Sequence, residues 1–174
     1  MYIPKITNLP SILTCNDGSC VTTVKEWESK RRGEIYDFFT DNVYGRIPAI
    51  DLKVSHTKER TETAESIEYD VVITTKTKFG SHSFRAYISV PKAKDPCPVF
   101  ELIQFPYQNT GMIKEKVLNR GYALARFYYP EVCTDDNNDF SGGIHAVVNA
   151  PDGGRKNHTW GAIASWAWAA SRVM

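Results

Sequence analysis

The segment PVFELIQFPYQNTGMIKEKVLNRGYALARFYY (Pro98–Tyr129) contains two apolar runs on either side of a helical pattern. The runs cover Pro98–Phe105 and Tyr122–Tyr129, and neither alternates cleanly between apolar and polar residues. Such runs are typical of parallel strands that are covered on both faces. A helix is predicted between them, around Met112–Asn119, and Gly121 separates it from the second strand. The segment therefore predicts a parallel strand–helix–strand unit with a right-handed crossover.

An antiparallel hairpin is predicted just before this unit. Glu65–Lys78 and Ser83–Val90 each alternate between apolar and polar residues, as half-buried strands do. The residues between them, Phe79–His82, include a glycine and supply the turn. Together, the hairpin and the parallel unit predict the α/β fold class.

A long amphipathic helix is predicted near the N-terminus, over residues 23 to 43. Residues 1 to 21 read as irregular, and Thr23 and Glu26 then form a capping-box pattern that starts the helix. Gly45 and Pro48 follow its end. We expect its apolar face to pack on the rest of the domain through three side chains: Trp27, Ile35 and Phe38.

The C-terminal stretch HTWGAIASWAWAASRVM (His158–Met174) reads as a helix from Trp160 onward, with no charged residue before Arg172. A helix that is apolar all round belongs inside a protein. The polar, Gly-rich residues 130 to 159 before it read as a long loop, which is usually functional or mobile. The sequence thus predicts a buried C-terminal helix reached through a long loop.

Composition places the chain among globular proteins with one domain, residues 1 to 174. It has 174 residues, of which 42% are hydrophobic and 24% charged, and a net charge of +1. No basic stripe with interleaved aromatics occurs, so we predict no nucleic-acid partner. No apolar run is long enough to span a membrane, and no signal peptide is visible. As written, the chain is expected in the cytoplasm, or in a secreted or periplasmic location if a leader has been removed.

No metal site or cofactor is predicted. The four cysteines are scattered, and only Cys15 and Cys20 are close, which permits one local disulfide but no zinc site. The acidic run from Asp135 to Asp139 hints at a calcium loop, but Phe140 stands where that loop needs glycine. The run therefore reads as a solvated acidic loop.

Three stretches resemble a known family. VTTVKEWESKRRGEIYDFFTDNVYGRIP (Val21–Pro48) looks like the N-terminal helix of the glucuronoyl esterases, carbohydrate esterase family 15, and of their acetyl-xylan-esterase-like relatives. NRGYALARFYYPEV (Asn119–Val132) resembles the fourth strand of that family, and WGAIASWAWAASRVM (Trp160–Met174) resembles the helix before its nucleophile-bearing strand. The resemblance implies the N-terminal half of an α/β-hydrolase.

No catalytic residue is predicted within this chain. In the family, the serine, the acid and the histidine all come after the helix that ends here, and no G-x-S-x-G motif occurs. Ser141 lies in the predicted loop, and Ser165 lies inside the last helix, where its hydroxyl would bond to its own backbone. The pattern favours an ordinary polar loop over a triad. The other residues that could act as acids or bases are His145, His158, Asp135, Asp136, Asp139 and Asp152.

One functional element of the fold falls within this half. In α/β-hydrolases the loop after the third strand, here Phe105–Asn109, gives a backbone N–H to the oxyanion hole. Pro106 has no N–H, so the resemblance makes Tyr107 or Gln108 the candidate donor. An ordinary loop is the alternative, because the segment departs from the Gly-rich or Asn-containing versions of the family.

The resemblance also predicts self-association. In the family fold the strand Val99–Phe105 lies beside the nucleophile-bearing strand, so its edge is open here, and open edges recruit further strands. The helix Trp160–Met174 should likewise expose some of its large side chains, among Trp160, Ile163, Trp166 and Trp168. We therefore expect a homo-oligomer through this edge, this helix or both.

Three functions stay open from the sequence. The first is the N-terminal segment of a serine carboxylesterase acting on plant cell-wall polysaccharide esters, inactive without its triad. The second is a truncated, non-catalytic module that oligomerises or binds a partner. The third is a carbohydrate-binding surface built on exposed aromatic residues, namely Tyr107, Tyr128 and Tyr129.

Overall fold

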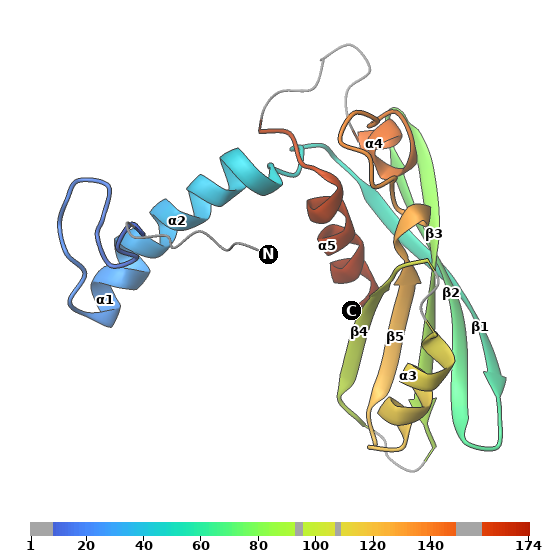
Figure 1. Ribbon diagram of the computed structural model, residues 1–174. Helices are drawn as coiled ribbons and strands as arrows, with labels where there is room; N and C mark the ends of the chain where they lie inside the picture. The colour runs from blue at the N-terminus through green and yellow to red at the C-terminus, as the bar shows by residue number, and fades with distance from the viewer. Residues whose placement is uncertain (1–8, 93–95, 107–108, 149–157) are drawn as a thin grey trace, which may run out of the picture.

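A computed structural model describes residues 9–92, 96–106, 109–148 and 158–174. Within these residues a mixed five-stranded sheet has the order β1-β2-β3-β5-β4 (Figure 1). The pairs β1–β2, β2–β3 and β3–β5 are antiparallel, and β4–β5 is parallel. The strands are β1 (Lys53–Glu62), β2 (Ser66–Thr77), β3 (Gly80–Pro91), β4 (Val99–Gln104) and β5 (Ala123–Tyr128). The predicted α/β class, hairpin and parallel unit are confirmed.

The hairpin β2–β3 turns one face toward the core. Ile73 pairs with Phe84, and both side chains are buried. The strand β1, which the sequence patterns did not predict, pairs with β2 at the edge of the sheet. All ten of its residues are exposed. Its sequence therefore does not need the alternation of apolar and polar residues that marks a half-buried strand.

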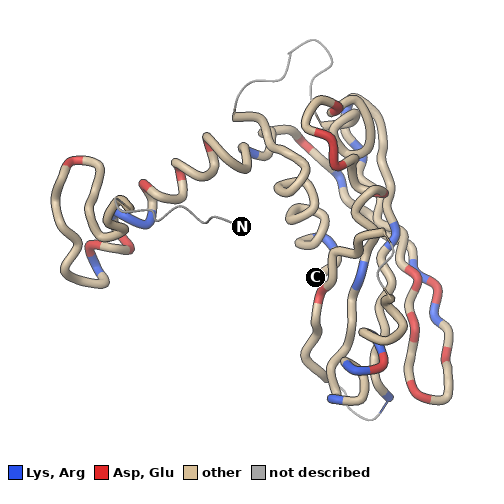
Figure 2. Tube along the Cα trace, in the orientation of Figure 1, with Lys and Arg blue, Asp and Glu red and all other residues tan. Residues whose placement is uncertain are grey.

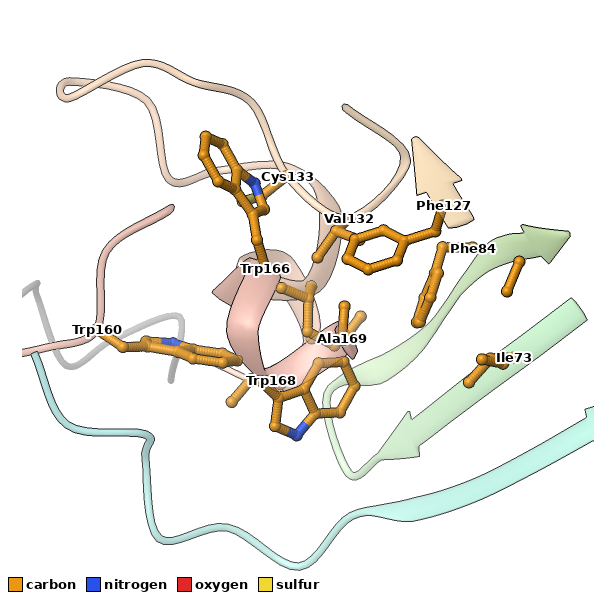
Figure 3. Close-up of a cluster of buried hydrophobic side chains, with 13 residues drawn as sticks. Ile73, Phe84, Phe127, Val132, Cys133, Trp160, Trp166, Trp168 and Ala169 are labelled. Atoms are coloured by element: carbon orange, nitrogen blue, oxygen red, sulfur yellow. The ribbon is translucent and has the colours of Figure 1, made fainter. Parts of the chain in front are cut away.

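Helices lie on both faces of the sheet. The helix α3 (Thr110–Leu118) crosses from β4 to β5, and its Lys114 forms an ion pair with Glu68 of β2. Successive strand residues point to opposite faces, so Glu68 and Ile73 mark different faces. The helix α5 (Ala162–Val173) packs over the face that carries Ile73 (Figure 3).

The main core joins this sheet face to aromatic residues near the C-terminus (Figure 3). Trp160 is fully buried, and Trp166 and Trp168 are each 6% exposed. Of the four side chains among which some were expected to be uncovered, the three indoles are buried by the chain itself, and Ile163 is exposed. The opposite side of α5 is open, since Ile163 is 59% exposed. The predicted C-terminal helix is thus buried on one side only.

Part of the predicted long loop is core rather than loop. A 3₁₀ turn spans Tyr129–Glu131, and the helix α4 spans Gly143–Val148. Four α4 residues are buried: Ile144, His145, Val147 and Val148. Gly143 has a φ of 59°, and an added Cβ would lie 2.2 Å from the Val132 carbonyl oxygen. This close approach lets the short helix dock. Residues 149–157 lie outside the described residues.

The N-terminal helix forms as predicted but does not pack as predicted. It runs through α1 (Val24–Glu26), a π-helical turn and α2 (Arg32–Phe39) to a second π-helical turn that ends at Tyr44, and the capping box of Thr23 and Glu26 is present. Figure 1 shows it projecting away from the sheet. None of its residues is buried, and Phe38 is 60% exposed. The expectation that Trp27, Ile35 and Phe38 pack on the domain is therefore wrong.

Backbone hydrogen bonds attach the end of this helix to the start of α5. Arg46 donates to His158 and accepts from Trp160, and Gly161 donates to the Tyr44 carbonyl. Gly45, with a φ of 81°, makes the turn at this junction, where a Cβ would clash with the Thr159 backbone. The helix is therefore held at one end, and its sides remain exposed.

The surface carries charges of both signs. Figure 2 shows acidic and basic residues interspersed over the described parts of the chain. None of the helices in the described ranges is both long and apolar enough to cross a membrane.

Candidate functional site

The carboxyl ends of the two parallel strands form the candidate site. Gln104 and Tyr128 are the last residues of β4 and β5, and they are paired across the ladder. Ligands of α/β sheets bind beyond the carboxyl ends of parallel strands. The loop from β4 to α3 leaves the sheet at this point. Its oxyanion candidates, Tyr107 and Gln108, lie outside the described residues, so their role stays a prediction.

The described parts of this loop are held at both ends. The Phe105 ring lies 4.9 Å from the Tyr129 ring and 5.9 Å from the Trp166 ring, measured between centroids. At the other end, the Asn109 side chain accepts a hydrogen bond from the Met112 N–H and caps α3. These contacts fix the described residues on either side of positions 107 and 108.

A polar pocket of about 510 Å³ opens beside these strand ends. It is lined by Tyr87, Gln104, Pro106, Arg126, Tyr128 and Glu131. Arg126 lies within the apolar run of β5, and Pro106 belongs to the candidate oxyanion loop. The apolar character of β5 marks it as a strand but did not point to Arg126 as a site residue. The signal available in the sequence was a single charge inside an otherwise apolar run, Tyr122–Tyr129.

One serine and one histidine meet in the core. The Ser165 Oγ lies 3.1 Å from His145 Nε2 and also donates to the Gly161 carbonyl at 2.9 Å. This second bond confirms the predicted backbone contact of Ser165. Both residues are buried, with exposed fractions of 0% and 1%. An ester cannot reach a hydroxyl in that position, so the pair joins α4 to α5 and is not a nucleophile with its base.

Of the other acid/base candidates in the described residues, Asp139 bonds to a serine, Ser141, on the exposed segment before α4. Asp135, Asp136 and Asp139 are exposed in the segment before α4. Asp139 accepts hydrogen bonds from the hydroxyl and N–H of Ser141, which lower the pKa of its carboxyl group. His158 is exposed at the junction with the N-terminal helix, and Asp152 lies outside the described residues.

The cysteines are all free thiols. Cys15 and Cys133 are buried and Cys20 is exposed, so the permitted local disulfide is not formed. Burial raises the pKa of the Cys133 thiol to about 11. Within the described ranges, no group of three or more His, Cys, Asp or Glu side chains is arranged to hold a metal ion.

The chain is similar in sequence and in structure to known carbohydrate esterases. No protein-family model matches the chain. A curated relative, carbohydrate esterase MZ0003 from an unknown prokaryotic organism, is 28% identical over 221 residues, covering 99% of this chain and 49% of the relative. The solved glucuronoyl esterase from Solibacter usitatus superposes with a TM-score of 0.81 at 25% identity, covering 96% of this chain and 52% of that one.

This chain resembles the N-terminal half of a family 15 carbohydrate esterase. A promiscuous family 15 esterase from a marine bacterial metagenome adds a third match, with a TM-score of 0.76, 27% identity and coverage of 97% of this chain and 52% of that one. The chain thus spans about half the length of the relatives that it matches. The partial α/β-hydrolase fold predicted from the sequence is confirmed.

Proposed function

We propose that this chain supplies the N-terminal half of a serine carboxylesterase of the glucuronoyl or acetyl-xylan esterase type, acting on plant cell-wall polysaccharide esters. The observation that carries the proposal is the match of nearly the whole chain to about half of a glucuronoyl esterase. The curated carbohydrate esterase supports the same substrate class. Cell-wall esters lie outside the cell, so this function requires a secreted or periplasmic protein.

In this proposal, this half of the enzyme stabilises the ester carbonyl oxygen and does not supply the serine that attacks the ester. In the proposed reaction a serine held by a histidine and an acid attacks the ester carbonyl, and negative charge develops on the carbonyl oxygen. The β4–α3 loop would offer the N–H of Tyr107 or Gln108 to that oxygen, and one such donor contributes ~3 kcal/mol to the transition state. The donor acts only when a nucleophile forms the oxyanion, so the chain by itself should be inactive.

Two measurements test this proposal. The isolated chain is assayed with an aryl acetate and a glucuronate alkyl ester, and turnover at the background rate is expected. Turnover that disappears when Ser141 or Ser165 is changed to Ala, with an unchanged melting midpoint, would contradict it. The DNA downstream of codon 174 is then read, and a continuation that encodes a serine-bearing strand-to-helix turn is expected. An immediate stop favours the second candidate.

The second candidate is a non-catalytic module that self-associates, and the outer edge of β4, which no other described strand pairs with, favours it. The Ala123 N–H donates to the Pro98 carbonyl at 2.9 Å, so alternate β4 residues face β5. In a parallel ladder the residues between them direct their N–H and C=O groups outward. These outward residues are Val99, Glu101 and Ile103. A second copy pairing on this edge, with contacts from the exposed side of α5, would form the homo-oligomer.

A further inference from the structure

Another pocket lies between the end of α5 and the antiparallel strands of the sheet. It has a volume of about 290 Å³ and is lined by residues of β1, β2, β3 and the last residues of the chain. The described residues that line it include none from β4, β5 or the loop between β4 and α3. This pocket is therefore separate from the candidate site at the strand ends.

The floor of the pocket is apolar. Val71 of β2, Ile88 of β3 and Val173 of α5 line it, and all three are only half-buried. An aliphatic ligand that covers these side chains removes their remaining surface from water, which favours binding. An enclosed apolar cavity of roughly 150 Å³ holds benzene, so a space about twice as large suits an aliphatic chain of about eight carbons.

The rim of the pocket is basic. His56 and Lys58 contribute to it from β1, and Arg172 contributes from α5. His56 and Lys58 share one face of β1 because alternate residues of a strand point the same way. None of the described residues that line the pocket is acidic. The pocket thus combines an apolar floor with positive charge at its opening.

The two permanent cations of this rim lack carboxylate partners. The Lys58 Nζ lies 5.6 Å from the Tyr69 ring centroid, and the Arg172 guanidinium carbon lies 5.9 Å from the Trp168 ring. Neither forms an ion pair with a carboxylate of the described residues, whereas Arg60, the next residue on this face of β1, has one. Arg172 also offsets the partial negative charge at the end of α5. The positive charge left without a counterpart is therefore that of Lys58.

We propose that this pocket binds a medium-chain aliphatic carboxylate, with its chain on the apolar floor and its carboxylate at Lys58 and Arg172. A neutral alkyl chain would leave the cations without an anion, and a small inorganic anion would leave the floor in contact with water. An amphiphilic anion satisfies both parts of the pocket. This site does not depend on the proposed esterase function.

Titrating the chain with sodium octanoate, followed by methyl NMR, tests the proposal. The methyl resonances of Ile88 and Val173 should shift and saturate, while those of Val117 in α3, on the other face of the sheet, should not. Each buried methylene strengthens binding about fourfold, so butyrate should bind at least tenfold more weakly than octanoate. 1-Octanol, which has the chain without the charge, should also bind at least tenfold more weakly.

Two exposed positions on β1 test the charge. Lys58→Gln should weaken octanoate binding at least fivefold. The matched control Lys53→Gln removes a lysine from the same strand that points to the other face, and it should leave the affinity unchanged. His56→Glu keeps Lys58 but places a carboxylate beside it, so it should weaken binding at least tenfold without lowering the melting midpoint.

Octanoate affinity unchanged by Lys58→Gln or His56→Glu would overturn the proposal. The same holds if no saturable shift occurs, if the shifts fall only outside the pocket, or if 1-octanol or butyrate binds as tightly as octanoate. The readout is affinity without turnover, so its failure is distinct from failure of the proposed esterase function.

Discussion

Replacing Trp160 by Ala tests where the stability of this chain resides. The Trp160 side chain is fully buried, and its ring lies 5.4 Å from His145 and 6.1 Å from Trp168 between centroids. Replacing a buried Trp by Ala costs ~3–5 kcal/mol. A domain of this kind has a total stability of ~5–15 kcal/mol, so Trp160→Ala removes a large share of it. For a chain of this length the melting midpoint should fall by ~6–20 °C.

The matched control is Trp27→Ala in the N-terminal helix, where the indole is half-buried and does not contact the sheet core. This change should alter the free energy of unfolding by less than ~1 kcal/mol, as surface substitutions usually do. Urea denaturation followed by far-UV circular dichroism measures both variants without relying on tryptophan fluorescence. Equal losses would refute the reasoning, because they would show that the N-terminal helix shares the core.

Two further outcomes are expected. If β4 pairs with a second copy, Glu101→Pro removes an outward N–H without breaking the ladder to β5, so sedimentation should shift toward monomer, whereas Glu101→Val should not shift it. For Glu68, burial alone would raise the pKa, but the Lys114 ammonium and the hydroxyls of Ser66 and Ser89 outweigh it and lower the pKa. This stabilisation is present above the ordinary glutamate pKa of about 4.3 and is lost as the pH falls toward the folded-state pKa. Glu68→Gln should therefore reduce the difference in urea midpoint between neutral and acidic pH, and an unchanged difference would contradict this account.

Local patterns predicted the elements that bury one face or both. The alternation in Glu65–Lys78 and Ser83–Val90 became β2 and β3, and the apolar runs around the predicted α3 helix became β4 and β5. The capping box at Thr23 placed the helix start correctly because its hydrogen bonds are local in sequence. The candidate site was predicted only in part. The loop after β4 was identified from the family resemblance, whereas the buried contact between Ser165 and His145 could be found only in the folded structure.

What covers each apolar face was decided by the tertiary structure. The sequence by itself determined that Trp27, Phe38 and Trp168 belong to apolar helix faces, since periodicity depends on neighbours along one chain. Only the fold showed that Trp168 is buried while Phe38 is exposed, and that Arg126 stacks on Tyr87. Burial and charge pairing arise from residues distant in sequence, so the strand pattern that hid Arg126 could not reveal the pocket around it.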